Sequence, residues 1–387
     1  MNFAFDENQQ LLRESTRRFL ADRQPLSAVR ARLESASTFD RAVWEEGAAL
    51  GWTAMLVPTE YDGGSVTHQP LVDAVAIAEE LGRVLYPGPF LPTNVVADAI
   101  AREGTDEQRK RFLAPIARGE TVAAWCLTAD GTPDLDAVAV TASGAPGGGL
   151  TLDGVARFVH DAHVADLLLV AGRTGASVVQ VLVPADHAGV ETRVLGGIDL
   201  TRRLCEVRFA GVTVDPEAVV GDGARTPDAI ARSLRVATVL QAAEAVGAAD
   251  ELFARTVEYA KERVQFGRAI GSFQAIKHKL ANLLVELEAA RAATHDAALA
   301  LADGADDAEE AVAVAGSYVR DACAHLSGEA LQTHGGIGFT WEHDVHLYVR
   351  RARSEQLLYG DPAWHRERLC TLVEARVPDG AAGAGAV

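Results

Sequence analysis

The segment Arg263–Ala281, which reads RVQFGRAIGSFQAIKHKLA, joins two long stretches of helical composition. Within it, a cation at Arg263, a polar side chain at Gln265 and an aromatic ring at Phe266 stand directly before a glycine. Such groups suit a diphosphate and a stacked purine. A turn that only connects two helices has the same pattern. The segment therefore predicts a helical hairpin and leaves nucleotide binding as a hypothesis.

Two further stretches have a composition that suits a ligand. The first, LQTHGGIGFTWEHD, spans 331–344, and its Gly335 and Gly336 end a predicted helix with bare backbone that a phosphate can approach closely. The second, WCLTADGTPD, spans 125–134 and holds Thr128, whose hydroxyl could bond a ring-shaped ligand. An ordinary helix cap and a buried strand are the structural alternatives.

Long helices are predicted on both sides of the Arg263 segment. Residues 227–263, 272–302 and 307–333 are rich in Ala, Leu and Glu, and Pro227 suits the start of a helix. Their length and apolar stripes indicate a helical bundle with an oligomer interface. We expect a tetramer or a dimer of dimers assembled through residues 227–334.

The preceding part of the chain divides into two regions. Helices are predicted over 6–23, over 71–82 with a stop at Gly82, and after a capping box that opens at Thr105. Short β-rich runs separated by Gly, Pro and Asp follow, which predicts a β-barrel or sandwich. The runs are TVAAWCLT, LDAVAVT, GLTLDGVARFVH, ADLLLVAG, SVVQVLVP and CEVRFAGVTV.

These patterns predict an α+β multidomain protein. We expect an N-terminal α-helical domain over 1–120, a middle β-barrel or sandwich domain over 121–226, a C-terminal helical bundle over 227–375 and a disordered tail over 376–387.

Composition excludes several function classes. The 387 residues carry 36 Lys and Arg against 54 Asp and Glu, a net charge of -18, which would repel nucleic acid. The four cysteines form no CxxC pair, and the N-terminus resembles no targeting segment. No run is apolar enough for a membrane span. We expect a cytoplasmic protein that neither binds nucleic acid nor inserts into membranes.

Motifs of common catalytic sites are absent, among them GxSxG, the P-loop and HExxH. Glu342, His343, Asp344 and His346 suggest a metal at first sight. Their spacing matches no closed ligand set, so we expect no metal.

The order and spacing of the three stretches resemble the acyl-CoA dehydrogenase family over nearly the whole chain, up to Trp364. YAKERVQFGRAIGSFQAIKHKLA and LQTHGGIGFTWEHDVHLYVRRAR are similar to the family's two C-terminal signatures. The resemblance implies a helical domain, a β-barrel-like domain and a C-terminal four-helix bundle that assembles tetramers. It also implies an FAD cofactor, an acyl-CoA or acyl-carrier-protein substrate, and an electron-transfer flavoprotein or similar acceptor.

In this family each FAD is held by residues of two subunits, so the resemblance assigns two half-sites. The half donated to a neighbouring subunit's FAD would hold its ADP part and pyrophosphate. Its residues here would be Arg263, Gln265, Phe266, Gln274, Gln332, Gly335 and Gly336.

The other half-site would hold the chain's own flavin. By resemblance, Thr128 would bond the isoalloxazine, and Phe158 stands where the family usually has a tryptophan that packs on it. His160 replaces a threonine that approaches flavin N5, and Asp134 replaces a serine that bonds the pyrophosphate. A carboxylate repels a phosphate, so these departures weaken the chain's own flavin site.

The family's chemistry needs a carboxylate that removes the α-proton of the thioester, with its pKa raised by burial. Tyr359 and Ala237 stand at the two positions where the family places that glutamate. Glu244 is the candidate base, because it lies seven residues after Ala237 on the same helical face. An interhelical hydrogen bond would explain it equally well, and Asp361 and Glu355 are weaker candidates.

Three functions remain open. The first is FAD-dependent α,β-dehydrogenation of an acyl thioester by this chain. The second is a non-catalytic subunit of a mixed tetramer, as in the two-gene bacterial enzymes that the chain resembles, because the donated half-site is the intact one. The third and most remote is a flavin monooxygenase on the same fold.

Overall fold

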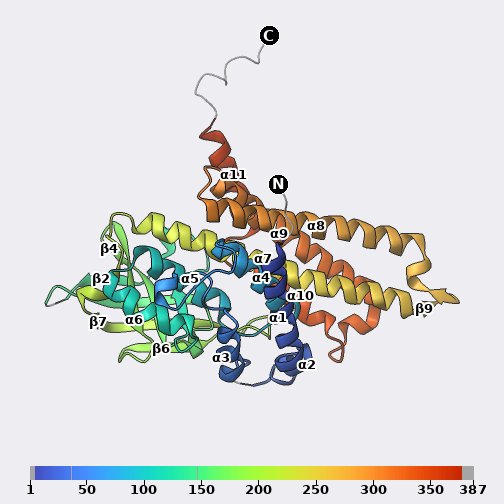
Figure 1. The fold of residues 1–387 in the computed structure, drawn as a ribbon, viewed down its shortest axis with the longest axis horizontal. Coiled ribbons are helices and arrows are strands. Elements are labelled where there is room, and N and C mark those ends of the chain that lie inside the picture. Colours follow the sequence, from blue (N-terminus) through green and yellow to red (C-terminus); the bar gives the residue numbers. More distant parts are fainter. Residues whose placement is uncertain (1–4, 36, 146, 377–387) are drawn as a thin grey trace, which may run out of the picture.

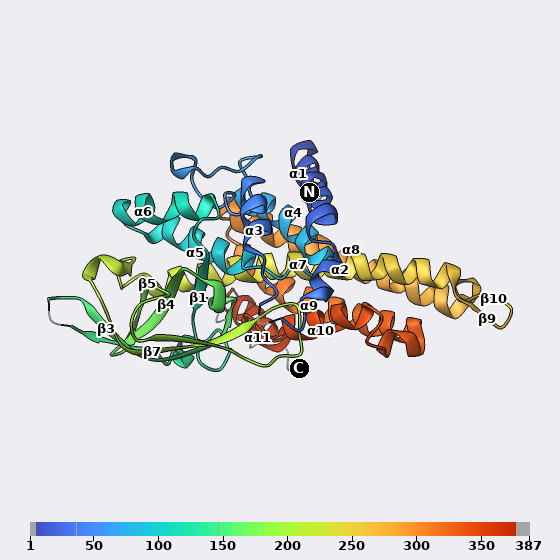
Figure 2. The same cartoon turned by 90° about the horizontal axis from the view of Figure 1, so that it is seen from below.

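The computed structural model describes residues 5–35, 37–145 and 147–376. The tail predicted over 376–387 lies outside these ranges except for Arg376. Helices, a sheet and more helices follow one another along the chain, with the sheet at one end of the molecule and the long C-terminal helices reaching to the other (Figures 1 and 2). None of the helices in these ranges has the length and apolar character to cross a bilayer.

The N-terminal helices follow the predicted signals closely. They are α1 (Glu7–Arg23), α2 (Leu26–Ala31), α3 (Arg41–Ala49), α4 (Pro70–Arg83), α5 (Phe90–Glu103) and α6 (Asp106–Ala117). Asp6 and Thr105 both form capping boxes, at the starts of α1 and α6. The predicted stop at Gly82 is wrong, because Gly82 lies inside α4 where another helix crosses it.

The middle region is one sheet. Its strands are β1 (Ala123–Cys126), β2 (Thr141–Gly144), β3 (Leu150–His160), β4 (Leu167–Thr174), β5 (Ser177–Pro184), β6 (Val190–Val194), β7 (Leu204–Val214) and β8 (Val219–Val220). The order is β6-β7-β3-β2-β4-β5-β8, with β1 added parallel to β4. One face is a separate apolar core that includes Leu168, Val170, Val181 and Val207.

Two strand predictions differ from the structure. The run LDAVAVT begins with a 3-10 turn over Leu135–Ala137, where Arg173 donates hydrogen bonds to backbone carbonyls of the loop. Strand β6 was not predicted, because its alternating run VETRV is only five residues long and most of its side chains are exposed.

The C-terminal region contains α7 (Thr226–Glu262), α8 (Gln274–Asp303), α9 (Ala308–His334), α10 (Val345–Glu355) and α11 (Pro362–Glu374). Helices α7 and α8 form an antiparallel hairpin. A two-stranded turn of β9 (Val264–Gln265) and β10 (Arg268–Ala269) closes the hairpin. Both views show this turn at the far tip of the molecule, away from the sheet (Figures 1 and 2).

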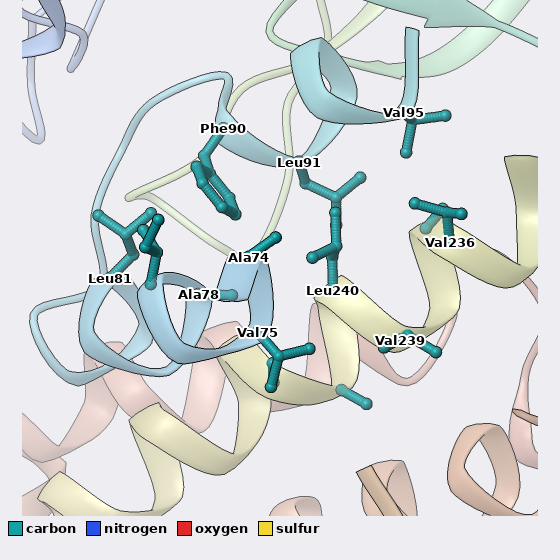
Figure 3. Close-up of a cluster of buried hydrophobic side chains, with 14 of the residues drawn as sticks. Ala74, Val75, Ala78, Leu81, Phe90, Leu91, Val95, Val236, Val239 and Leu240 are labelled. Atoms are coloured by element: carbon teal, nitrogen blue, oxygen red, sulfur yellow. The ribbon is translucent and has the colours of Figure 1, made fainter. Parts of the chain in front are cut away.

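The main core lies where α4 and α5 pack on α7, and Figure 3 shows its side chains. Phe90, Leu91 and Leu240 are almost fully buried there. Helices α4 and α7 cross in backbone contact, since a Cβ on Gly247 would lie 1.9 Å from the Glu79 carbonyl oxygen. The glycines therefore set the distance between these two helices.

Candidate functional site

The tip of the α7–α8 hairpin presents its side chains to solvent. Arg263 caps α7 through a bond from its N–H to the Tyr259 carbonyl (2.8 Å). Phe266 has a φ of 54° and is 93% exposed. Its ring meets Phe273 edge-on at 6.2 Å, and Arg268 lies 4.1 Å above the Phe273 ring. With Val264, which is 56% exposed, Phe266 gives the tip an exposed apolar surface.

The end of α9 lies beside this tip. The Tyr259 ring stacks on His334 at 4.4 Å, and its hydroxyl donates to the His334 carbonyl (3.2 Å). Gly335 follows directly, with a φ of 64° that ends the helix. Because Tyr259 is one turn before Arg263, the ends of α7 and α9 are adjacent.

The predicted donated half-site is thus gathered at one end of the bundle, which we call the arm end. All of its residues are exposed except Gly335, which is half-buried. The arm end comprises Arg263, Gln265, Phe266, Gln274, Gln332, Gly335 and Gly336.

On the sheet side, Thr128 and Asp134 are bonded within the chain. The Thr128 hydroxyl donates to the Thr132 carbonyl (2.7 Å) and closes the loop that follows β1. The Trp364 indole N–H donates to the Asp134 carboxylate (3.0 Å) and ties this loop to α11. Asp361 is also a structural residue, since its carboxylate caps α11 through the Trp364 N–H (2.7 Å).

A cavity of about 480 Å³ lies beside this loop. Phe158, with a φ of 57°, lines it together with Gly131, Gly360 and Trp364. Its size falls in the range of small-molecule sites. Most of its lining is apolar or glycine.

Aromatic rings stand between this region and the interior. Trp125 stacks on Tyr359 at 6.1 Å, and the His160 ring lies 5.2 Å from Tyr359. His160 is buried, and within the described part of the chain neither ring nitrogen has a hydrogen-bond partner. Burial, with Arg202 and Arg351 nearby, holds the pKa of His160 well below its ordinary value. The imidazole is therefore neutral.

Glu244 belongs to a buried charge cluster that joins the sheet to the C-terminal helices. Arg202, in the loop before β7, donates to Glu244 of α7 and lies 3.4 Å from the Glu355 carboxylate of α10. Arg351 of α10 donates to Asp199 (2.6 Å) and lies 3.7 Å from Glu355. Each of these five side chains is less than a tenth exposed. Ala237, one of the family's base positions, is fully buried near the α4–α5–α7 core.

The ion pairs of the cluster join three carboxylates to two guanidinium groups, and a third buried guanidinium, Arg320, donates to the Glu355 backbone carbonyl (3.3 Å). Burial raises the pKa of Glu355 to about 7, although Arg351 and Arg202 oppose the shift. One Glu355 oxygen has no hydrogen-bond partner among the described residues. Burial also raises the pKa of the neighbouring Asp161 to about 6. Glu355 and Asp161 are therefore buried carboxyl groups whose pKa values lie near neutrality.

Arg202, Arg351 and Asp199 were not among the sequence candidates. The run DLTRR before β7 is a signal, because several charged residues there precede a buried strand. Arg202 is 42 positions from Glu244 and 153 from Glu355, and Asp199 is 152 positions from Arg351, so no local pattern predicts these contacts.

The residues that suggest a metal take other contacts. Asp344 pairs with Arg30 (2.9 Å), and His346 stacks on Trp341 at 4.9 Å. The described ranges contain no group of His, Cys, Asp and Glu side chains arranged to bind a metal ion.

Comparison with known proteins gives matches along almost the whole chain. The model of the acyl-CoA dehydrogenase N-terminal domain matches residues 6–120, and that of the C-terminal domain matches residues 227–371. Acyl-CoA dehydrogenase IpdE2 of Mycolicibacterium smegmatis is 32% identical over 365 residues, which cover 94% of this chain and 98% of the relative.

Solved structures agree with these matches. Butyryl-CoA dehydrogenase from Megasphaera elsdenii superposes with a TM-score of 0.90 at 24% identity, over 97% of this chain and 100% of that chain. The ChsE4-ChsE5 complex from Mycobacterium tuberculosis gives 0.86 at 26% identity, over 98% and 100%. The helix–sheet–helix order and the two C-terminal signatures agree with the same family as these matches. The chain belongs to the acyl-CoA dehydrogenase family, oxidoreductases that act on the CH–CH bond of acyl-CoA substrates.

Proposed function

We propose that this chain is a non-catalytic subunit of a heteromeric acyl-CoA dehydrogenase, and that its arm end completes the FAD site of a partner subunit from the same family. The observation that carries this proposal is the difference between the two half-sites. The arm end exposes its side chains to a ligand, whereas on the sheet side the Thr128 hydroxyl and the Asp134 carboxylate are bonded within the chain.

The arm end fits the ADP half of FAD. Arg263 supplies a charge for the diphosphate, Phe266 supplies an exposed ring, and Gly335 supplies backbone without a Cβ. When bound in the partner, FAD would accept the hydride from the β-carbon of the acyl thioester. The role of this chain's residues is to bind and orient the cofactor. The assembled enzyme would pass electrons to an electron-transfer flavoprotein or a similar acceptor.

The chain's own half-site does not fit FAD. Asp134 places a carboxylate where the pyrophosphate is expected, and Trp364 already bonds that carboxylate. A second anion beside it would be repelled. The Thr128 hydroxyl, expected to bond the flavin, is already donated to the Thr132 carbonyl. We therefore assign no catalytic step to this half-site.

The comparison with ChsE4-ChsE5 supports the heteromeric reading, because that structure is a complex of two named proteins and this chain matches a whole chain of it. Shared family membership favours an acyl-CoA substrate for the assembled enzyme. The acyl group itself is left open.

The test uses the chain co-purified with a second family member from the same genome. We expect Arg263→Ala to lower the affinity of the complex for FAD more than tenfold, because a charged hydrogen bond is worth about 1.5–3 kcal/mol. Phe158→Ala, on the sheet side, is the matched control and should leave FAD retention unchanged. The reverse pattern, with FAD lost from Phe158→Ala alone, would show that the chain holds its own flavin.

A second candidate is dehydrogenation by this chain itself, with Glu244 as the base. It is favoured by one observation, the presence of buried carboxyl groups that include Glu355 with a pKa of about 7. Glu244 would first have to leave its ion pair with Arg202. If Glu244 is the base, Glu244→Gln slows flavin bleaching by an acyl-CoA thioester by several powers of ten while FAD stays bound. We expect no such loss.

A further inference from the structure

A second cavity, of about 420 Å³, shares no lining residue with the cavity beside the loop that follows β1. Its walls come from residues 55–59, from the end of α5 and from α7. It is remote from the arm end, since Arg232 in its wall precedes Arg263 by 31 positions along α7, about 46 Å at 1.5 Å per residue. None of the residues considered for FAD lines it.

One wall of this cavity carries two arginines that share a single aspartate. Asp98 is 5% exposed, and one of its carboxylate oxygens accepts a bond from Arg102 Nε (3.0 Å) while the other accepts from Arg232 Nε (3.3 Å). One carboxylate therefore serves two guanidinium groups, and the group has a net charge of about +1. In the described part of the chain, the Nη atoms of both arginines have no hydrogen-bond partner.

The two arginines differ in exposure, since the Arg102 side chain is 50% exposed and only Arg232 is partly desolvated. The Arg232 side chain is 23% exposed, and burial lowers the pKa of Arg232, with Arg102 adding to the lowering while Asp98 opposes it. Guanidinium groups stay charged in spite of such shifts. An anion placed against the free Nη atoms would be stabilised by charge-assisted hydrogen bonds.

The remaining surface of the cavity is largely apolar. Val236, part of the wall, also belongs to the core between α4, α5 and α7 (Figure 3). A hydrocarbon chain lying on this floor would lose contact with water. The apolar lining residues are Met55, Leu56, Val57, Pro58, Pro70, Leu71, Ala101, Val236 and Ala302.

We infer that this cavity binds an amphipathic anion, with a carboxylate or phosphate head on Arg102 and Arg232 and an aliphatic tail over the apolar floor. A volume of about 420 Å³ lies in the range of small-molecule sites. The protein as a whole carries a net charge of -18 and repels anions, so a positive cavity is a local exception. This inference is independent of the proposed FAD role.

The first experiment needs no variant. Isothermal titration of the whole chain with decanoate, decyl phosphate, decanol and decylammonium, each below its micelle concentration, compares heads on one tail. We expect one binding site for decanoate or decyl phosphate, with decanol at least tenfold weaker and decylammonium weaker still. The tighter of the two anions identifies the head. Equal affinity for decanol, or no binding of either anion, overturns the inference.

Variants place the ligand. We expect Arg232→Gln to weaken decanoate binding at least tenfold and Ala302→Phe, which fills the floor, to remove it. Arg225→Gln is the matched control, because Arg225 also lies at the start of α7, pairs with Asp222 and is outside the cavity. If Arg232→Gln does not fold, the Ala302→Phe variant and the comparison of the four ligands with different head groups test the inference. Decanoate binding that survives in Ala302→Phe overturns the site.

Discussion

Arg202 holds two carboxylates in the interior, and this determines how substitutions at either partner act. Glu244 and Glu355 come from different helices, α7 and α10, and both reach a loop of the sheet. The cluster therefore links the sheet to the helical bundle. Removing Glu244 leaves the buried Arg202 guanidinium with Glu355 as its remaining ion-pair partner.

We predict that Glu244→Ala lowers the free energy of unfolding by about 1.5–3 kcal/mol, because Arg202 loses one buried charged hydrogen bond while Glu355 still compensates its charge. Urea denaturation of the purified chain measures it. Glu258→Ala is the matched control on the same helix, since Glu258 is exposed and pairs with Lys261. Its effect should stay within about 0.5 kcal/mol. Equal effects of the two variants would contradict the account of the cluster.

Glu355 gives a pH-dependent prediction. Its pKa is raised to about 7 in the folded protein from an ordinary value of 4.5, so the folded state binds this proton more tightly than the unfolded state. Stability from this group is therefore present at low pH and falls as the pH rises from about 4.5 to 7, by about 3 kcal/mol in all.

Glu355→Gln keeps the side-chain size and does not titrate. Between pH 5 and pH 8, the parent should lose up to about 3 kcal/mol of unfolding free energy relative to this variant. Other buried groups titrate in both proteins, and the difference between the two curves removes their contribution. Glu374→Gln, at an exposed site on α11, is the control and should follow the parent. Parallel curves for the parent and Glu355→Gln would mean that Glu355 is ionised throughout.

The sequence predicts site residues that stand in continuous motifs better than contacts between distant positions. The arm-end residues stand in two continuous motifs, so order and spacing were enough to single them out. The ion pair of Glu244 with Arg202 joins positions 42 apart, and that of Arg351 with Asp199 joins positions 152 apart. Such contacts depend on how the sheet docks on the helices, which no local pattern encodes.

Among the elements, the crossing of α4 and α7 depends on glycine. A Cβ on Gly82 would lie 2.0 Å from the Glu244 carbonyl oxygen, and one on Gly247 would lie 1.9 Å from that of Glu79. Both opposing atoms are backbone, which cannot move aside without shifting a helix. The same crossing explains why the helix stop predicted at Gly82 was wrong, since this glycine serves close packing.

We predict that Gly247→Ala lowers the free energy of unfolding by at least about 2 kcal/mol, because overpacking costs about 1–3 kcal/mol or more. The melting temperature should fall accordingly. Gly328→Ala is the matched control. Gly328 lies inside α9, where the nearest neighbour of an added Cβ is the end of the Arg353 side chain at 4.0 Å. That variant should be neutral or slightly stabilising, because Ala favours helix over Gly by about 1 kcal/mol. A well-tolerated Gly247→Ala would contradict the close crossing.

Helices were predicted more accurately than strands. Capping boxes, Pro227 and the long apolar patterns gave bounds within a few residues for α1, α6, α7, α8 and α9. Strand β6 and the 3-10 turn at Leu135 were not predicted, because an exposed edge strand and a turn held by Arg173 are defined by neighbours in space.

At the scale of the whole molecule, the arm end and the sheet lie at opposite ends (Figure 1). One chain cannot bring its own arm end to its own sheet-side loop. The exposed Phe266 ring at the tip is consistent with a second subunit, and further apolar side chains on α8, Leu284 and Val285, are 43% and 71% exposed. We expect assembly through the helices over 227–334, which sedimentation at micromolar concentration would detect.

The most direct test of the central claim is the FAD content of the purified protein. We predict that the chain expressed alone retains no stoichiometric FAD, and that the complex with its partner subunit retains one FAD for each pair of chains. The ratio of flavin to protein absorbance gives both values. A chain that purifies alone with one FAD per polypeptide, and whose flavin is bleached anaerobically by an acyl-CoA thioester, would contradict the account.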